Sequence, residues 1–355
     1  MKILIAGGGT GGHLFPALAL AEAVKAKGGE VLLVGSGRKI EELALAQRDF
    51  KTICLSGEGL VGRPLTAKFR ALKRLLTSLR EARRIIKSFL PRVVFGVGGY
   101  ASFPVVLAAK MSGLPTAIHE QNSIPGLANR VLGRLATRVF ISFKSAARYF
   151  SPEKTIFSGN PVRPELFRLP PRQHEGLGLL VTGGSQGARF INRLVVEMVP
   201  RLFEALPDLF LIHQTGFNDQ ELVAASYRSH GFRARVYPFI KDMAWAYAQA
   251  DLVLCRAGAT TIAELSALGK PAIFIPFPYA THGHQEENAR LVVERGGGLM
   301  YREGEVNAES LASALVALLK DRERRLEMGQ RIKGLMPHNA LEIILAETEA
   351  LLHHA

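Results

Sequence analysis

The side chains with the clearest chemical purpose lie in one stretch, DLVLCRAGATTIAELSALGKPAIFIPFPYATHGHQEEN, which runs from Asp251 to Asn288. Its apolar runs and turn residues predict two strands, each followed by a helix. Two helix N-termini then meet at one edge of a parallel sheet. Unpaired N–H groups and the helix dipole make such ends suited to phosphate, so the stretch is a candidate site for a phosphorylated ligand.

Polar side chains on these two helices suit the sugars of such a ligand. Glu264 lies one helical turn beyond Thr260 and Thr261, where its carboxylate can accept hydrogen bonds from vicinal ribose hydroxyls. Gln285 and Asn288 are three residues apart on the next helix and offer amide donors and acceptors for sugar hydroxyls. The spacing favours a nucleotide diphosphate-sugar site. The alternative is an ordinary βαβα unit with a solvated surface acid.

A glycine-rich turn, Gly7 to Gly12, follows the first expected strand and opens a helix. It matches G-x-G-x-x-G, the dinucleotide fingerprint, but no acid stands at the end of the second strand at Val34 to bind a ribose. Arg38 leaves an NADP oxidoreductase as a weak alternative. The better interpretation is a turn whose backbone approaches a phosphate or a sugar. His13 is then either a general base or a helix-capping residue.

Two further polar turns follow later strands of the first half. Gly98, Gly99 and Tyr100 come after a strand expected at 92–97, and the polar run 119–122 comes after a strand expected at 116–118. Open α/β sheets bind their ligands at the carboxyl ends of the strands. We therefore expect these turns to lie at the same sheet edge as the first glycine-rich turn.

The arrangement of elements predicts two doubly wound, Rossmann-like α/β domains that face each other across a cleft. The 355 residues suffice for two hydrophobic cores. The joint at 160–164 is rich in proline, and a new strand and a glycine-rich turn at 183–188 follow it. The expected domains are residues 1–160 and 161–336, and a C-terminal helix within 337–355 is expected to cross back to the first domain.

Several classes of protein do not fit the sequence. No run of about 18 uncharged apolar residues predicts a membrane-spanning helix, and the chain enters a strand directly, without a signal peptide. Cys54 and Cys255 have no C-x-x-C spacing and are expected to be buried thiols in a reducing compartment. The absence of Asp-x-Asp predicts that no metal holds the diphosphate, and hydrolase motifs are absent.

The basic excess of the chain is confined to its first half. Up to Asn160 the chain has 24 Lys and Arg residues against nine Asp and Glu residues, which indicates an anionic partner for this half. A helix expected at 68–89 carries eight cations and a single acid beside an apolar stripe, and it follows an apolar loop at 57–64. We favour an anionic membrane surface over nucleic acid, because the helix has no Tyr, Trp or His for base stacking.

Six motifs together resemble one family over nearly the whole chain. They are GGGTGGHLFPALALAEAV, GVGGYASFP, HEQNSIPGLANR, SGNPVR, VTGGSQGA and RAGATTIAEL, the last continued by PAIFIPFPYA and HQEENA. They resemble the bacterial peptidoglycan N-acetylglucosaminyltransferases that glycosylate lipid I, which is undecaprenyl-pyrophosphoryl-N-acetylmuramyl-pentapeptide. The resemblance implies a two-domain GT-B fold and an inverting, metal-independent transfer from UDP-GlcNAc without cofactors. It also implies a peripheral protein at the cytoplasmic face of the bacterial cell membrane that acts on no nucleic acid.

The resemblance also implies roles for individual residues. Donor contacts would come from Thr10, Gly11, Gly12, Asn122, Arg163, Ser185, Ile240 (through its backbone, to uracil), Ala259, Thr260, Thr261, Glu264, Gln285 and Asn288. Gly98, Gly99 and Tyr100 would face the acceptor pyrophosphate, and His13 and Glu120 are the two candidates for the base. The membrane-facing patch often includes Trp in this family. Here the only Trp is Trp245, so the patch would consist of Leu60, Val61, Phe69, Lys73 and Leu76.

The chain departs from the family motif at one further position, and two alternative functions are compatible with the sequence. His284 stands where the family often has a second Gln before Gln285. A related GT-B transferase that uses a diacylglycerol acceptor would have a similar donor site. A non-catalytic lipid-binding or nucleic-acid-binding module could keep the fold without needing His13 and Glu120.

Overall fold

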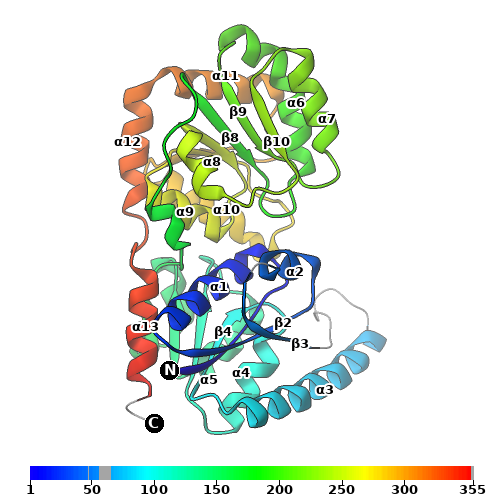
Figure 1. The fold of residues 1–355 in the computed structure, drawn as a ribbon, viewed down its shortest axis with the longest axis vertical. Helices are drawn as coiled ribbons and strands as arrows, with labels where there is room; N and C mark the ends of the chain where they lie inside the picture. The colour runs from blue at the N-terminus through cyan, green and yellow to red at the C-terminus, as the bar shows by residue number, and fades with distance from the viewer. Residues whose placement is uncertain (47, 56–64, 353–355) are drawn as a thin grey trace. The chain divides into compact units, whose positions relative to one another are not determined.

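The computed structural model describes residues 1–46, 48–55 and 65–352, and for residues 39, 40, 43 and 65–74 it describes the backbone only. The chain divides into two compact units (Figure 1). Unit 1 consists of Met1–Val162 with Pro337–Ala355, and unit 2 is Arg163–Met336.

Unit 1 is built on a parallel sheet that, among the described residues, has seven strands in the order β3-β2-β1-β4-β5-β6-β7. The strands are β1 (Lys2–Gly7), β2 (Glu30–Gly35), β3 (Lys51–Cys54), β4 (Val93–Gly98), β5 (Thr116–Glu120), β6 (Arg138–Ile141) and β7 (Thr155–Phe157). The helices are α1 (Gly11–Ala26), α2 (Lys39–Leu45), α3 (Leu65–Phe89), α4 (Ser102–Met111), α5 (Leu127–Leu135) and α13 (Ala340–Ala350), with the 3-10 turns η1 (Lys144–Tyr149) and η2 (Pro152–Lys154).

Alternate residues of the central strands supply two separate cores, one on each face of this sheet. Leu4 and Ala6 of β1 pack with residues of α3, α4 and α5. Ile3 and Ile5 of the same strand pack with residues of α1 and α13. Because side chains alternate across a strand, a continuous apolar run such as β1 can fill both cores. The sheet is therefore covered on both faces, which confirms the predicted doubly wound architecture.

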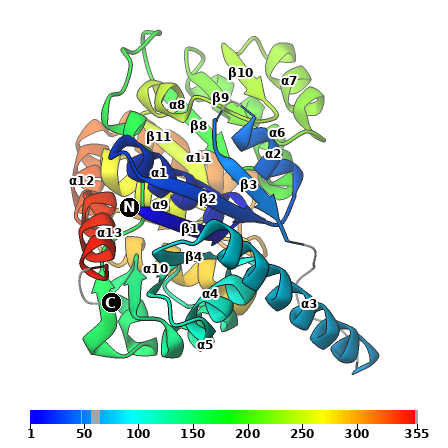
Figure 2. The ribbon, with the colours of Figure 1, turned by 60° about the horizontal axis from the view of Figure 1, so that its bottom comes forward.

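The last helix, α13, belongs to unit 1 although unit 2 precedes it in the chain (Figures 1 and 2). Ile344 and Leu345 are buried in the same core as residues of α1. Two ion pairs lie beside this apolar contact, Lys27–Glu349 at 3.3 Å and Arg138–Glu347 at 3.6 Å. Both pairs are partly exposed, so burial of the apolar side chains supplies most of the stabilisation.

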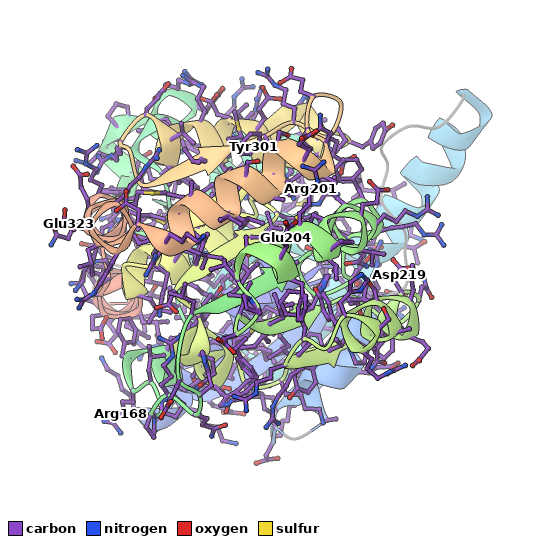
Figure 3. All side chains as sticks on the ribbon, turned by 90° about the horizontal axis from the view of Figure 1, so that it is seen from above. Arg168, Arg201, Glu204, Asp219, Tyr301 and Glu323 are labelled. Atoms are coloured by element: carbon purple, nitrogen blue, oxygen red, sulfur yellow. The ribbon has the colours of Figure 1, made fainter. Side chains whose placement is uncertain are left out.

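Unit 2 repeats the architecture with six parallel strands, among the described residues, in the order β10-β9-β8-β11-β12-β13. The strands are β8 (Gly178–Thr182), β9 (Phe210–Gln214), β10 (Ala234–Tyr237), β11 (Leu252–Cys255), β12 (Ala272–Phe274) and β13 (Gly298–Met300). The helices are α6 (Arg189–Ala205), α7 (Gln220–Ser229), α8 (Met243–Gln249), α9 (Ala259–Leu268), α10 (His284–Val293), α11 (Ala308–Lys320) and α12 (Arg322–Lys333), with the 3-10 turns η3 (Pro164–Phe167) and η4 (Thr281–Gly283). Helices α6 and α11 pack together, and Arg201 is labelled on α6 in Figure 3. An ion pair of 2.9 Å joins Arg201 to Glu309 of α11.

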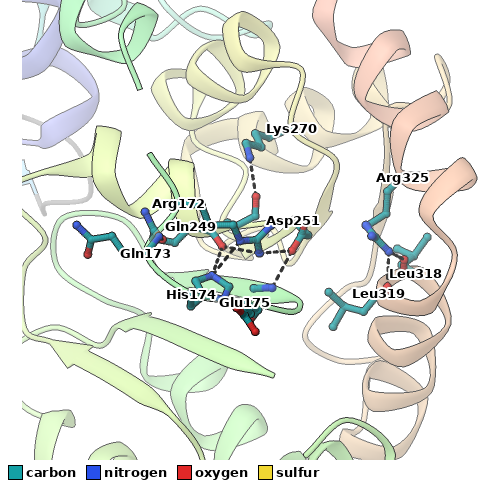
Figure 4. A network of polar contacts seen from close by, with 12 residues as sticks. Arg172, Gln173, His174, Glu175, Gln249, Asp251, Lys270, Leu318, Leu319 and Arg325 are labelled. Atoms are coloured by element: carbon teal, nitrogen blue, oxygen red, sulfur yellow. Dashed lines mark hydrogen bonds and ion pairs between the residues drawn. The ribbon is translucent and has the colours of Figure 1, made fainter. Parts of the chain in front are cut away.

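A polar cluster fastens the segment before β8 to the start of β11 (Figure 4). The guanidinium of Arg172 contacts both carboxylate oxygens of Asp251, at 3.2 and 2.5 Å, and donates to the carbonyl of Gln249. The side chain of Gln249 accepts from the backbone N–H of Gln173 at 2.6 Å. Burial opposes ionisation of Asp251, but the bonds from Arg172 and Gly178 outweigh it and lower the pKa of the carboxyl. This cluster lies at the amino ends of the strands, away from the edge where parallel sheets bind ligands.

The structure differs from the sequence analysis at three points. Helix α2 and strand β13 were not expected, because both are short and lack a clear periodicity. Cys54 is exposed on the edge strand β3, whereas Cys255 is buried as expected. Ile240, which the resemblance assigns to uracil, lies beyond the end of β10. Over residues 1–46, 48–55 and 65–352, none of the helices is long and apolar enough to cross a membrane.

Candidate active site

The polar turns of unit 1 meet where its strand order reverses. Strands β1 and β4 are neighbours, and the chain runs outward from them in opposite directions. This switch point is where open α/β sheets bind ligands. A Cβ atom on Gly99 would lie 2.4 Å from the carbonyl oxygen of Gly8, so the two glycine-rich turns touch backbone to backbone. The predicted acceptor residues Gly98 and Gly99 therefore lie directly against the turn that carries the predicted donor residues.

His13 lies in the first turn of α1, at this switch point. The carbonyl of Thr10 accepts hydrogen bonds from the N–H groups of His13 and Leu14, at 3.2 and 3.0 Å, and thereby starts the helix. Gly11 is buried, whereas Gly12 is exposed and His13 is half-buried. The Nδ1 atom of His13 lies 3.1 Å from Oε1 of Gln121. The ring is thus held on one side by an amide while part of it remains accessible.

Only a glycine fits at position 98 beside this ring. A Cβ atom there would lie 2.8 Å from both Nδ1 and Cε1 of His13, and the backbone φ of +97° is one that other residues rarely adopt. The position of His13 and the backbone conformation together explain why the motif GVGGY has a glycine at position 98.

Glu120 is the second candidate base, and it is buried at the end of β5. Its Oε1 atom accepts from the backbone N–H and from the side-chain amide of Asn122, at 2.9 and 3.3 Å, and its Oε2 atom accepts from Asn129 at 2.8 Å. The side chain is only 2% exposed. Burial raises the pKa of Glu120 to about 7, although these hydrogen bonds oppose the shift. Asn122, a predicted donor contact, is half-buried beside it.

The carboxylate of Glu41, in α2, fixes the first glycine-rich turn and was not among the expected site residues. It accepts from the backbone N–H groups of Gly9 at 2.6 Å, Ser36 at 2.9 Å and Gly37 at 2.8 Å. A protein carboxylate thus occupies an N–H group that a dinucleotide-binding turn would offer to a pyrophosphate. This arrangement weighs against the NADP alternative. The dinucleotide-binding pattern has an acid directly at the end of the second strand. Glu41 was overlooked because it lies six residues after β2 ends at Gly35.

Of the remaining predicted residues of unit 1, Tyr100 contacts α3 and Leu76 is part of it. The hydroxyl of Tyr100 is 3.0 Å from the hydroxyl of the buried Ser78. Leu76 is 50% exposed, which leaves it available to a lipid surface. Leu60 and Val61 lie outside the described residues, and the side chains of Phe69 and Lys73 lie outside the described atoms.

In unit 2, the predicted donor residues Arg163 and Glu264 bind each other. The Nη2 atom of Arg163 lies 2.9 Å from Oε1 of Glu264, and the hydroxyl of Tyr247 donates to Oε2 at 2.8 Å. Glu264 is 5% exposed. Burial and the nearby carboxylate raise the pKa of Tyr247 far above its usual value, so the phenol stays a donor. Each carboxylate oxygen retains a second lone pair that can accept from a ribose hydroxyl.

The switch point of unit 2 lies between β8 and β11, and the turns after these strands hold several predicted donor residues. Ser185 is half-buried in the turn between β8 and α6, and Ala259, Thr260 and Thr261 form the first turn of α9. Gln214 was not anticipated from the sequence. Its amide donates to the carbonyl of Gly184 at 2.5 Å and accepts from the N–H of Ile240 at 3.1 Å. It thereby joins the glycine-rich turn to the segment that the resemblance assigns to uracil.

The two predicted sugar-binding amides on α10 have different surroundings. The side chain of Gln285 accepts from the N–H of Phe277 at 3.0 Å and is half-buried. Asn288 is fully buried and donates to the carbonyl of Ala257 at 3.3 Å. Asn288 therefore braces the turn before α9, and Gln285 is the more accessible of the two.

Two family models match the chain. The glycosyltransferase family 28 N-terminal domain matches residues 3–141, and the glycosyltransferase family 28 C-terminal domain matches residues 178–341. A protein of Geotalea uraniireducens (strain Rf4), described as UDP-N-acetylglucosamine--N-acetylmuramyl-(pentapeptide) pyrophosphoryl-undecaprenol N-acetylglucosamine transferase, is 45% identical over 98% of this chain and 97% of its own length. A protein of Syntrophus aciditrophicus (strain SB) with the same description is 47% identical over 92% of this chain and 93% of its own length.

The chain is also similar to solved structures. The crystal structure of Acinetobacter baumannii MurG has a TM-score of 0.75 and 30% identity, over 99% of this chain and 100% of that one. The UDP-GlcNAc 2-epimerase from Neisseria meningitidis bound to UDP-GlcNAc has a TM-score of 0.68 at 14% identity, over 99% of this chain and 100% of that one. The second likeness shows a shared fold alone, because the identity is too low to carry a function.

Proposed function

Because this chain belongs to glycosyltransferase family 28, we propose that it transfers N-acetylglucosamine from UDP-GlcNAc to the C4 hydroxyl of the N-acetylmuramyl unit of lipid I. The product is lipid II, the precursor of peptidoglycan. The main observation in support is that, in each sheet, the turns with the motif residues follow the two strands at which the strand order reverses, β1 and β4 in unit 1 and β8 and β11 in unit 2. The relatives named after this reaction align with nearly the whole chain, which supports lipid I over a diacylglycerol acceptor.

The proposed reaction is a single displacement with inversion. The C4 oxygen of the acceptor forms a bond to the anomeric carbon of GlcNAc while the bond from that carbon to the diphosphate oxygen breaks. UDP leaves with the electron pair, and the hydroxyl proton passes to a base of the protein. An α-linked donor thereby becomes a β-1,4 product. Assistance by a general base typically contributes about 10²–10⁴-fold to the rate.

His13 and Glu120 are the candidate bases in unit 1. Glu120 has a pKa of about 7, which suits a proton acceptor at neutral pH, but donors from Asn122 and Asn129 surround its carboxylate. His13 is more accessible, since it is half-buried whereas Glu120 is 2% exposed. Accessibility to the acceptor hydroxyl therefore favours His13.

We assign the donor to unit 2. Glu264 and the first turn of α9 would hold the ribose and the phosphates, because the carboxylate lies one turn from the helix N-terminus. Arg163 would neutralise the diphosphate and Gln285 would contact the GlcNAc. Ile240 would offer its carbonyl to uracil, since its N–H is already bonded to Gln214.

We propose further that α3 docks the protein on the cytoplasmic face of an anionic membrane. Its described cations Arg80, Arg83, Arg84 and Lys87 are exposed, and one end of the helix projects beyond the sheet (Figure 2). Leu76 adds an exposed apolar side chain. Each cation near such a surface contributes about 1 kcal/mol, so these four can support peripheral attachment.

The deciding experiment is transfer of radiolabelled GlcNAc from UDP-GlcNAc to a lipid I analogue, with EDTA present and diacylglycerol as the alternative acceptor. We expect lipid I to be glycosylated and diacylglycerol not. Transfer to diacylglycerol alone would replace the acceptor and keep the donor site. Absence of transfer to either would refute the enzyme in favour of a binding module.

A further inference from the structure

One buried amide, that of Gln121, connects the two histidines of unit 1. Gln121 is 1% exposed. Its Nε2 atom lies 2.8 Å from the carbonyl oxygen of Val97 and 3.0 Å from Nδ1 of His119. Its Oε1 atom lies 3.1 Å from Nδ1 of His13. We call this series of contacts, from Gly159 through His119 and Gln121 to His13, the Gln121 relay.

The chemistry of its neighbours decides which way the amide of Gln121 points. The carbonyl oxygens of Val97 and His119, at 2.8 and 3.3 Å, can only accept hydrogen bonds. The opposite orientation would place the amide oxygen against both carbonyl oxygens, which repel it, and would remove the donor from Val97; the carbonyl of His119 also accepts from Asn129 at 3.2 Å. The NH₂ group therefore faces Val97 and His119, and the oxygen faces His13.

The bond of His119 to Gly159 leads independently to the same orientation. The Nε2 atom of His119 lies 3.0 Å from the carbonyl oxygen of Gly159, which can only accept, and 3.3 Å from the hydroxyl of Ser142, which can accept as well as donate. A ring proton on Nε2 suits both neighbours, whereas a bare Nε2 would face the lone pairs of the Gly159 carbonyl. The Nδ1 atom of a neutral His119 is then an acceptor and requires the NH₂ group of Gln121. Burial lowers the pKa of His119 to about 4, so the ring is neutral near pH 7 and keeps this arrangement.

We propose that Gln121 is a positioning residue that fixes the tautomer of His13, with the proton on Nδ1 and a lone pair on Nε2. Since Oε1 of Gln121 can only accept, the Nδ1 atom of His13 must donate to it. The proton of the acceptor hydroxyl then passes to Nε2, and the imidazolium keeps its Nδ1–H bond to Gln121. Gly98 supports the arrangement, because any Cβ atom there would displace the ring. This inference rests on the proposed function, in which His13 is the base.

Without Gln121, the imidazole of His13 would adopt both tautomers. A ring that already carries its proton on Nε2 cannot accept the proton of the acceptor hydroxyl at that atom. We therefore expect Gln121→Met, which keeps the volume and removes the amide, to lower kcat about 10-fold, a part of the roughly 10²–10⁴-fold that a general base supplies. The KM for UDP-GlcNAc should stay within about twofold, since this change acts on the proton transfer and not on uniform binding.

The direct test is ¹⁵N NMR of the full-length protein labelled at histidine, because the protonated and the bare ring nitrogens have different chemical shifts. The signals of His13 among the ten histidines are identified by their loss in His13→Gln. We expect the proton on Nδ1 in the wild type and a mixture of tautomers in Gln121→Met. A wild-type ring with its proton on Nε2 would overturn the proposal, even if the variant fails to fold.

A matched control separates this role from the general cost of losing a buried amide. Gln249→Met makes the same change at a fully buried glutamine of unit 2, which bonds Gln173 and does not touch His13. It should lower stability yet leave kcat and the tautomer of His13 unchanged. Equal kcat values for Gln121→Met and the wild type would also overturn the proposal. A wild type that transfers no GlcNAc would instead refute the proposed function, while the NMR spectrum still decides the tautomer.

Discussion

Glu264→Gln tests the donor site most sharply, because the carboxylate has both a structural and a proposed ligand-binding role. It accepts from Arg163 at 2.9 Å and from Tyr247 at 2.8 Å while only 5% exposed. The substitution removes the charge that pairs with Arg163 and places an amide donor where only acceptors fit. A hydrogen bond to a charged group contributes about 1.5–3 kcal/mol, so affinity for UDP should fall roughly 10- to 150-fold.

The assay is calorimetric titration of UDP and of 2′,3′-dideoxy-UDP against wild type and variant. In this double-mutant cycle, the wild type should bind 2′,3′-dideoxy-UDP more weakly than UDP. Glu264→Gln should bind the two ligands with nearly equal affinity. Equal losses in both proteins would refute ribose recognition by Glu264. Breaking a buried ion pair also destabilises by about 3–5 kcal/mol, so urea unfolding accompanies the titration. Asp251→Asn is the control: it removes the charge paired with Arg172 at the other end of β11 and should leave UDP affinity unchanged.

Three further predictions concern pH, the membrane and metal. The folded-state pKa of Glu120 is about 7, above its usual 4.5, because burial favours the protonated carboxyl. The protonated side chain therefore stabilises the folded protein fully below about pH 4.5, and this stabilisation is lost as pH rises towards 7. Urea unfolding should show this loss, about 3 kcal/mol, in the wild type and not in Glu120→Gln. Gln at positions Arg80, Arg83, Arg84 and Lys87 together should weaken binding to anionic vesicles about 10³-fold, at about 1 kcal/mol per charge. Turnover of a water-soluble acceptor should stay unchanged. Vesicle binding equal to that of the wild type would refute docking through α3. Transfer should persist in EDTA, and a loss that Mg²⁺ restores would contradict the metal-free donor site.

The sequence was sufficient for most of the strands and for the two-unit architecture, because buried parallel strands are continuous apolar runs that end at glycine-rich turns. Strands β4 and β5 have bounds within two residues of those expected at 92–97 and 116–118. The short elements α2 and β13 were missed, since their few residues carry no periodicity. Cys54 was expected to be buried and is exposed, because an apolar run cannot distinguish an edge strand such as β3 from a central one.

The partners of the site residues were harder to predict than the residues themselves. Arg163 and Glu264 are 101 positions apart, and nothing in their local sequence shows that they pair. Glu41 reaches the first glycine-rich turn from a helix that was not expected. The tautomer of His13 depends on a carbonyl at Gly159, through two intervening side chains. Such relations depend on distances between atoms, which spacing along the chain does not specify.

The return of α13 to unit 1 has a consequence for synthesis on the ribosome. Residues 1–162 emerge first, but the core that contains Ile344 and Leu345 cannot close until unit 2 has also been made. Translation adds about 5–20 residues per second, so the apolar face that α13 covers stays open for roughly 10–40 s. During that interval unit 2 can fold on its own, while unit 1 exposes the side of α1 that α13 later buries. We therefore expect the N-terminal unit, though made first, to be the last to complete its core and the one that depends more on chaperones.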